Sequence, residues 1–339
     1  MVEINFINEF NASGNSYGYA THQKNIRDAL IRNGVTISNF ADICLHITPA
    51  CSFKPVIGKK NVLYTMYEMD TLPPNWYTKF KDVDLFIVPC QQNKELFSRY
   101  TDKPIEVCSE GCDTDYFNYI DRHNRDKTNF IFLWLGANNV RKGWLNIAYA
   151  WEEFRKLIPK AMLVIKTTPN REDTQEVCEL DRENSIILDS RHLGFDREGD
   201  TPALREVYHR ADAFLMPSMG EGFCLPLIEA MATGLPCIYS NTGFASDYLD
   251  DRYGYEVSAV KADVSTWERL GENKEDYRRL EHFTHAIWAK PQSIIEQMLN
   301  VYYHYDQAIT KGYNASNLVR QRLTWDISAK NLIKILGKV

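Results

Sequence analysis

The chain has no apolar run of the roughly 18 residues that a membrane-spanning helix needs. Its first residues, MVEINFINEF, carry neither the basic nor the apolar segment of a signal peptide. A strong positive charge is also missing, because the net charge is −6. Nucleic acid is therefore disfavoured as a partner, although a local basic groove is left open. From these absences we expect a cytoplasmic protein without a transmembrane segment.

Paired cysteines and metal-binding patterns are also scarce. Eight cysteines are scattered along the chain, and several lie inside apolar runs, which is typical of reduced, buried thiols: Cys44, Cys90, Cys108 and Cys237. Cys108 and Cys112 have a C-x3-C spacing, but no second pair or histidine cluster completes a zinc site. The fingerprint G-x-G-x-x-G is missing, which argues against a nicotinamide enzyme.

What is present is an alternation of strand-like and helix-like segments over 339 residues, a length that exceeds what one hydrophobic core usually serves. A polar stretch at 121–128 interrupts the series and is the best linker candidate. We therefore predict an α/β protein with two Rossmann-like domains, 1–120 and 129–325. The predicted strands are 4–7, 43–47, 62–67, 85–89 and 105–108, then 130–135, 162–165, 186–188, 213–216 and 236–239. The predicted helices include 16–33, 74–80, 91–100, 293–305 and 326–336.

The most informative segment reads EGFCLPLIE, from Glu221 to Glu229. An apolar strand leads into a Gly-Phe turn, and Pro226 fits the first turn of a helix that ends at Gly234. Such a turn leaves backbone N–H groups at a helix N-terminus, where a phosphate can bind. Glu221 and Glu229 could accept hydrogen bonds from sugar hydroxyls on either side of that phosphate. A nucleotide diphosphate-sugar has this arrangement of groups.

The extended segment EGFCLPLIEAMATGLP resembles the E-x7-E motif of the retaining glycosyltransferases of family 4, which have the GT-B fold. The resemblance implies that Glu221 contacts the donor sugar and that Glu229 binds the ribose. It implies that the turn amides hold the diphosphate, at Gly222, Phe223, Cys224 and Leu225. It also implies a cleft between an acceptor domain, 1–120, and a donor domain, 129–325, with the final helix, 326–339, crossing back to the first domain.

A second segment, LGANNVRKG, follows the first strand of the second half and contains Arg141 and Lys142. Cations at this position can stabilise the negative charge that develops on a departing nucleotide. Family members commonly have a Gly-Arg pair and then Lys-Gly. Here Lys142 matches, Ala137 occupies the expected arginine position, and Arg141 is the candidate substitute. The alternative interpretation is an ordinary basic helix start, which is locally unfavourable unless an anion binds.

Five further residues are candidates for ligand contacts. Gly14 lies in a glycine-rich loop after the first strand, where a donor contact and a plain flexible loop are both open. Lys166 and Arg191 follow strands of the second half, where they could contact the nucleotide or be solvated loop charges. Glu68 and Asp70 lie in TMYEMD at the end of a strand and could bind the acceptor or the donor sugar, whereas Glu68 could instead cap the following turn.

The pair Asp113 and Asp115 forms a D-x-D sequence that would hold a metal in another glycosyltransferase fold. Here the segment resembles the turn that ends the first GT-B domain. We therefore predict a structural use, with no metal site and no cofactor.

The sequence thus predicts a retaining GT-B glycosyltransferase. Its co-substrate would be a nucleotide diphosphate-sugar, with a UDP-sugar first and GDP-mannose next. The acceptor would be a glycan or another hydroxyl compound. Two alternatives stay open at this point. One is a GT-B-like sugar-nucleotide epimerase or hydrolase, and the other is a non-catalytic protein that binds a sugar nucleotide or a glycan.

Overall fold

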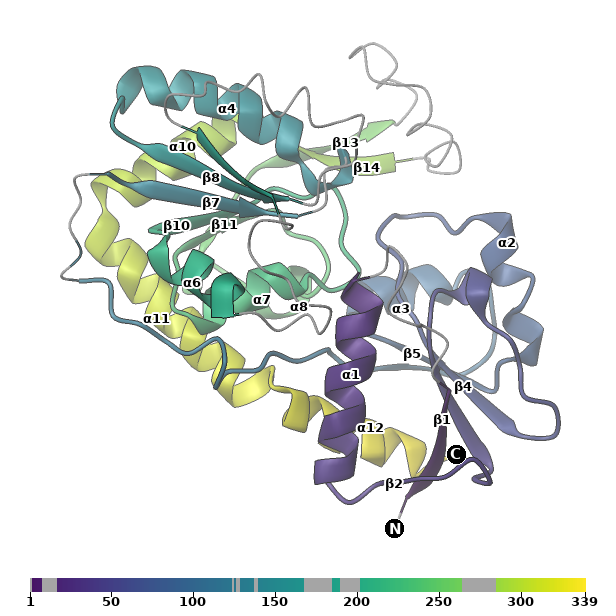
Figure 1. Ribbon diagram of the computed structural model, residues 1–339. Helices are drawn as coiled ribbons and strands as arrows, with labels where there is room; N and C mark the ends of the chain where they lie inside the picture. The colour runs from purple at the N-terminus through teal and green to yellow at the C-terminus, as the bar shows by residue number, and fades with distance from the viewer. Residues whose placement is uncertain are drawn as a thin grey trace.

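The computed structural model describes residues 2–7, 17–123, 125, 129–136, 140–167, 185–189, 202–263 and 285–339. Two six-stranded parallel sheets organise these residues, one in each half of the chain. Figure 1 shows them side by side, with both chain ends in the first half. The predicted α/β class is confirmed.

The first sheet has the strand order β2-β1-β3-β4-β5-β6. Its strands are β1 (Glu3–Ile7), β2 (Thr36–Ile37), β3 (Ile43–Ile47), β4 (Lys60–Tyr64), β5 (Leu85–Val88) and β6 (Ile105–Val107). Its helical segments are α1 (Tyr17–Arg32), η1 (Ala50–Ser52), α2 (Pro74–Tyr77), η2 (Phe80–Asp82) and α3 (Gln91–Phe97). Most of the central residues of this sheet are apolar and buried, as expected for parallel strands covered on both faces.

The second sheet has the order β12-β11-β10-β7-β8-β9. Its strands are β7 (Ile131–Leu135), β8 (Met162–Thr167), β9 (Ser185–Asp189), β10 (Ala213–Met216), β11 (Cys237–Tyr239) and β12 (Tyr255–Glu256). The helical segments of this half are η3 (Val140–Lys142), α4 (Trp144–Leu157), α6 (Pro202–Arg210), α7 (Leu225–Ala232), α8 (Ala245–Tyr248), α10 (Pro291–Tyr303) and α11 (Tyr305–Arg322). A separate antiparallel pair consists of β13 (Ala259–Asp263) and β14 (His285–Ala289).

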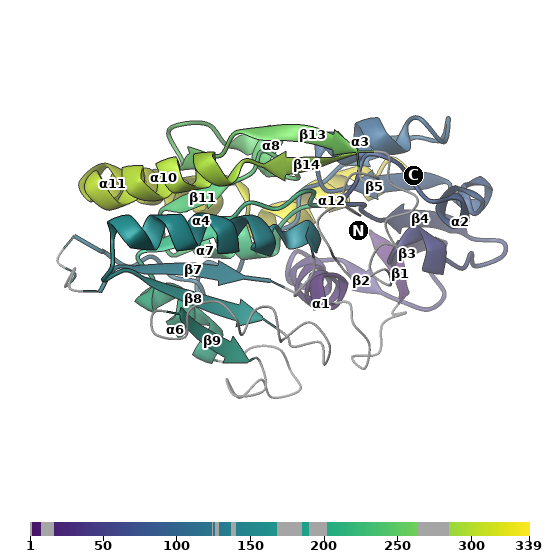
Figure 2. The same ribbon diagram turned by 90° about the horizontal axis from the view of Figure 1, so that it is seen from above.

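The core of the second half has two layers because neighbouring strand residues point to opposite faces of the sheet. Phe132 and Leu215 pack with α4 and α10, whereas Leu133 and Phe214 pack with α6 and α7. Figure 2 shows α4 and α10 on one side of β7 and β8, and α6 on the other. This packing holds the carboxyl ends of β7, β8 and β10 at one edge, from which the loops described below emerge.

The chain crosses twice between the halves, and the two crossings touch. The Cys112 amide donates to the Leu323 carbonyl at 2.8 Å, and Cys112 forms a β-bridge with Thr324. A Cβ on Gly111 would lie 2.3 Å from the Trp325 amide nitrogen, so only glycine fits this approach. Beyond the second crossing, α12 (Trp325–Leu336) packs its apolar face on α1. Figure 1 shows the two helices next to each other.

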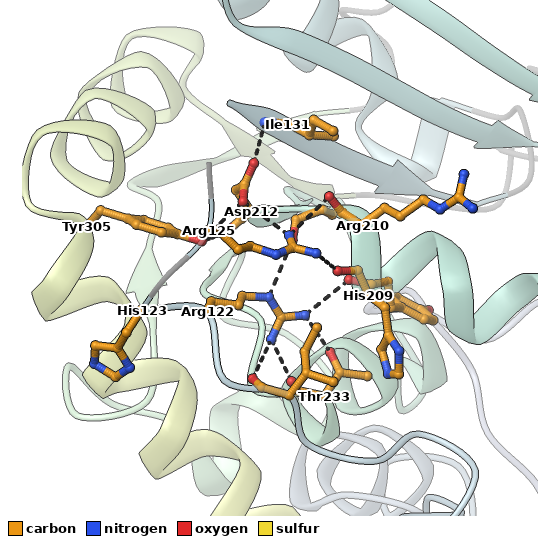
Figure 3. Close-up of polar contacts among 12 residues, drawn as sticks. Arg122, His123, Arg125, Ile131, His209, Arg210, Asp212, Thr233 and Tyr305 are labelled. Atoms are coloured by element: carbon orange, nitrogen blue, oxygen red, sulfur yellow. Dashed lines mark hydrogen bonds and ion pairs between the residues drawn. The ribbon is translucent and has the colours of Figure 1, made fainter. Parts of the chain in front are cut away.

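The predicted linker is not a solvated tether where the structure describes it. Arg122 is only 1% exposed, and its guanidinium donates to the carbonyls of Thr233 (2.6 Å) and Tyr208 (3.1 Å). Arg125 reaches the Asp212 carboxylate at 3.2 Å. Figure 3 shows these contacts, which tie the start of the second half to the C-terminal ends of α6 and α7.

Seven cysteines lie within the described residues; none forms a disulfide there, and Cys44, Cys90, Cys108 and Cys237 are buried as predicted. No helix among the described residues combines the length and the apolar character needed to cross a bilayer. The cytoplasmic location and the domain limits 1–120 and 129–325 stay predictions.

Candidate donor-binding site

The turn between β10 and α7 presents a row of backbone amides. Cys224 is the N-cap of α7 and has a φ of 93°, which is unfavourable for a residue with a Cβ. Within the described part of the chain, the four consecutive amides of residues 222–225 donate no hydrogen bond. Because Pro226 follows, the helix start adds no further donor at that position. The turn can therefore accept an anion without breaking any described bond.

Glu221 lies at the start of this turn and is held by two cations. Its side chain is 6% exposed, and Lys142 Nζ lies 2.8 Å and 3.1 Å from its two carboxylate oxygens. Arg141 Nη1 lies 3.2 Å from Oε2. Burial alone would raise the pKa of Glu221, but Lys142 and Arg141 outweigh burial and lower that pKa. Glu221 is thus a buried, ionised carboxylate paired with two cations.

The positions of Arg141 and Lys142 depend on Gly143. Gly143 caps α4 with a φ of 72°, and a Cβ on it would lie 2.0 Å from the Pro217 carbonyl oxygen. The Arg141 carbonyl accepts from the Met219 amide at 2.7 Å, and the Lys142 carbonyl accepts from Trp134 Nε1 at 3.3 Å. These contacts fasten η3 to the loop after β10, so the two predicted segments meet in space.

Glu229 and Lys166 lie on the other side of the turn. Glu229 is partly buried on α7, and the Tyr208 hydroxyl donates to its Oε2 at 2.8 Å. Lys166 is 8% exposed at the carboxyl end of β8. Burial lowers the pKa of Lys166 to about 8, and the charge of Glu229 opposes that shift. A carboxylate of α7 and a cation at the end of β8 are therefore close enough to influence each other electrostatically.

The first half of the chain reaches this site through Glu68. Its carboxylate lies 3.6 Å from Arg141 Nη2. Burial opposes the charge on Arg141, but Glu68 and Glu221 outweigh burial and raise the pKa of Arg141. Asp70 accepts a hydrogen bond from the Thr71 hydroxyl at 3.2 Å, and its backbone carbonyl accepts one from Arg99 at 2.8 Å. The structure thus brings Glu68 of the first half to Arg141 of the second half.

Two glycines of the turn allow this approach of the two halves. A Cβ on Gly220 would lie 2.0 Å from the Glu68 carbonyl oxygen, and one on Gly222 would lie 2.8 Å from Met66 Cγ. The Gly222 carbonyl also accepts from Cys90 Sγ at 3.3 Å. Phe223 faces inward, 2% exposed, and packs on Phe244.

Sequence reasoning missed three polar residues around the site. Thr242 accepts from the Glu221 amide at 3.2 Å, and Gln92 of the first half accepts from the Gly243 amide at 2.9 Å. Tyr208 is the third. These three residues do not belong to a recognisable sequence motif. Nothing in the sequence therefore distinguishes them from other polar residues of the chain.

Several predicted residues lie outside the described residues: Gly14, Arg191 and Ala137. Among the described residues, no group of three or more metal-ligating side chains comes together. Asp113 accepts from the amides of Asp115 (3.1 Å) and Tyr116 (3.0 Å), so it stabilises a turn.

Comparison with solved structures defines the fold class as GT-B. The protein from Anabaena described as Alr3699/HepE in complex with UDP and glucose superposes with a TM-score of 0.71, at 12% identity, over 100% of both chains. Residues 115–282, just under half of the chain, match the family described as "Glycosyl transferases group 1".

Curated relatives match parts of the chain. Lipopolysaccharide 1,2-N-acetylglucosaminetransferase from Salmonella typhimurium is 27% identical over 172 residues, 49% of this chain and 43% of that protein. UDP-Gal:alpha-D-GlcNAc-diphosphoundecaprenol alpha-1,3-galactosyltransferase from Escherichia coli is 29% identical over 34% of this chain and 29% of its own length. The chain thus spans less than half the length of these relatives.

Proposed function

We propose that the protein is a retaining glycosyltransferase of family 4 that transfers a sugar from a UDP-sugar to an acceptor hydroxyl. The observation that carries the proposal is the pairing of Lys142 and Arg141 with the buried Glu221 beside four unbonded amides. Two cations and four amide donors at one helix start suit a diphosphate. A carboxylate fixed next to them suits the hydroxyls of the attached sugar.

In this mechanism the diphosphate binds the amides of residues 222–225, and Lys142 and Arg141 stabilise the charge that develops on it as the glycosidic bond breaks. Glu221 orients the sugar and Glu229 accepts hydrogen bonds from the ribose. The acceptor oxygen attacks from the face that the nucleotide leaves, so configuration is retained without a protein nucleophile. The leaving phosphate oxygen takes the acceptor proton, and the reaction proceeds without a metal ion or other cofactor.

A uridine nucleotide is the favoured donor nucleotide because the names of similar proteins contain UDP or a UDP-sugar. The Anabaena protein of the same fold was solved in complex with UDP and glucose, and the Escherichia coli relative is named for a UDP-galactose donor. The side chains around the described site carry no feature that would select a particular hexose.

A glycan is the proposed acceptor class. The two relatives are named for lipopolysaccharide and a diphosphoundecaprenol-linked sugar. Glu68 supports the proposal structurally, because it is 36% exposed at the point where the first half meets Arg141. A carboxylate there can accept a hydrogen bond from an acceptor hydroxyl next to the breaking bond.

The test is a thermal-shift screen against UDP, GDP and their common sugar conjugates, with and without Mn²⁺. A ligand at about 100 times its Kd adds roughly 2.7 kcal/mol of stability. Stabilisation by the uridine series alone, without metal, is the expected result. Incubation with the bound donor in the absence of acceptor then separates the rivals, because an epimerase or hydrolase would convert the donor rapidly. If no nucleotide stabilises the protein, the proposal is wrong.

A further inference from the structure

Tyr208 lies between the two helices that build one side of the candidate site. It is on α6, it is fully buried, and its hydroxyl donates to Glu229 Oε2 on α7 at 2.8 Å. The Pro226 carbonyl, at 3.2 Å, is a second, longer acceptor for the same hydroxyl. Because a phenol has one hydrogen, the shorter bond to the charged carboxylate dominates.

The ring of Tyr208 has little freedom to move. Phe117 packs edge-on against it at a centroid distance of 5.7 Å, and Phe214 lies at 5.9 Å on β10. Burial, with the negative charge of Glu229 adding to it, raises the pKa of Tyr208 well above its usual value. The hydroxyl therefore keeps its proton and acts as a permanent donor to the carboxylate.

The backbone of Tyr208 is fixed as well. Arg122 Nη2 donates to the Tyr208 carbonyl at 3.1 Å, while Nη1 donates to the Thr233 carbonyl at 2.6 Å. These carbonyls belong to the C-terminal ends of α6 and α7, where a cation is favourable. Figure 3 shows Arg122 between the two chain segments. One buried guanidinium thus sets the spacing of the helix that carries Tyr208 and the helix that carries Glu229.

We propose that Tyr208 is a positioning residue that aims the Glu229 carboxylate at the ribose hydroxyls of the donor nucleotide. The inference rests on the proposed function, which assigns the ribose to Glu229. A carboxylate has two oxygens with about four acceptor positions, and the bond from Tyr208 uses one of them. That bond fixes the rotation of the carboxylate. Nucleotide recognition consequently depends on a residue that does not touch the nucleotide.

The test compares UDP with 2′,3′-dideoxyuridine diphosphate, and GDP with its dideoxy form alongside, by calorimetric titration of the whole chain. The wild type should prefer the ribose form by about tenfold or more, as expected for hydrogen bonds to a charged group. Tyr208→Phe should bind the ribose form more weakly and reduce the preference to roughly threefold or less, with dideoxy binding unchanged. In a Glu229→Ala background, Tyr208→Phe should add no further loss.

Tyr239→Phe is the matched control. Tyr239 is a buried tyrosine in the same apolar cluster, and its hydroxyl has no hydrogen-bond partner among the described residues. This variant should leave both affinities unchanged, and circular dichroism should show that both variants are folded.

Each remaining outcome overturns a specific statement. If Tyr208→Phe keeps the wild-type preference for the ribose form, only this inference is overturned. The same holds if the substitution weakens binding of UDP and of the dideoxy nucleotide equally. Binding of UDP without any preference for ribose overturns the role of Glu229 and the inference with it. Failure of the wild type to bind any of the nucleotides overturns the proposed function itself.

Discussion

At the scale of single residues, the charged side chains of the candidate site form ion pairs with one another: Glu221 with Lys142 and with Arg141. Glu221 is buried, yet its pKa lies below the usual value because Lys142 and Arg141 outweigh the effect of burial. A carboxylate with a lowered pKa stabilises the fold above its unfolded pKa, and this contribution is lost as the pH falls through the folded value. The two cations are thus held in place by Glu221, and in the proposed mechanism a diphosphate would meet them with little rearrangement.

Substitutions of Lys142 and Glu229 should affect different kinetic parameters, because the first residue is proposed to act in the chemical step and the second in donor binding. Lys142→Ala should lower kcat by roughly 10² to 10³, the range for loss of one group that stabilises transition-state charge. Glu229→Ala should raise the donor KM with a smaller change in kcat, because ribose contacts exist in both ground and transition states. Steady-state kinetics measures both, and Lys160→Ala, an exposed lysine beyond α4, is the control. Unchanged kinetics in both folded variants would contradict the site assignment.

Lys166 predicts a pH dependence of nucleotide binding. Its pKa of about 8 means that the ammonium is charged below pH 8 and loses its proton above it. If Lys166 contacts the nucleotide phosphates, UDP affinity should fall as the pH rises through about 8. Titration calorimetry over about three pH units around that pKa measures the change.

Two variants serve as controls for this profile. Lys166→Arg keeps its charge over the whole range and should give a flat profile with affinity retained. Lys166→Met should give a flat profile with weaker binding. A profile in the wild type that is already flat would show that Lys166 does not meet the phosphates.

At the scale of elements, the C-terminal ends of α6 and α7 share one buried cation. Arg122 satisfies carbonyls that the helices leave unbonded at their ends, from Tyr208, Ala211 and Thr233. Burial lowers the pKa of Arg122 to about 10, so it stays protonated at neutral pH. The segment predicted as a linker is for this reason part of the second half.

Arg122→Leu should lower the free energy of unfolding by about 3 kcal/mol or more, because buried carbonyls lose a charged donor. Urea unfolding followed by circular dichroism measures this change. Arg252→Leu is the control, since Arg252 is 67% exposed and pairs on the surface with Asp250. The control should change stability by no more than about 0.5 kcal/mol. Equal effects of the two substitutions would show that the buried contacts are not stabilising.

At the scale of the whole molecule, the two halves meet through backbone contacts at glycines. The Gly220 position has no room for a Cβ, because the Glu68 carbonyl oxygen of the other half would lie 2.0 Å away. Next to it, Glu68 and Arg141 form an ion pair across the junction. In the described arrangement Glu68 of the first half and Arg141 of the second half are therefore already in contact.

Gly220→Ala should force the halves apart. We expect turnover to fall strongly while UDP affinity is largely kept, because the proposed donor contacts all come from the second half. Small-angle X-ray scattering should show a larger radius of gyration than in the wild type. Gly337→Ala is the control, as the nearest heavy atom to its Cβ would be 3.4 Å away. An unchanged radius together with full activity would contradict this account of the junction.

Much of the fold could be predicted because buried parallel strands have continuous apolar runs. β3 and β10 have the predicted bounds, since both are buried and flanked by polar residues. The prediction 62–67 was wrong at its end: β4 stops at Tyr64, and the Tyr19 hydroxyl hydrogen-bonds Met66 instead. The helix α11 was not predicted, because its sequence contains Gly312, several polar residues and only a weak apolar stripe. A Cβ on Gly312 would lie 2.2 Å from the Gly234 carbonyl, a contact no local pattern reveals.

The sequence by itself determined the features that depend on neighbours along the chain: the strand runs, the turn of residues 221–229 and the basic turn at Arg141 and Lys142. Local chemistry is sufficient there, because apolar periodicity and turn residues act over a few positions. Tertiary structure alone decided which polar groups meet: Glu221 with Lys142, Glu68 with Arg141, and Tyr208 with Glu229. These pairs are brought together by the packing of helices on two sheets and by two chain crossings, and no pattern along the chain records such distances.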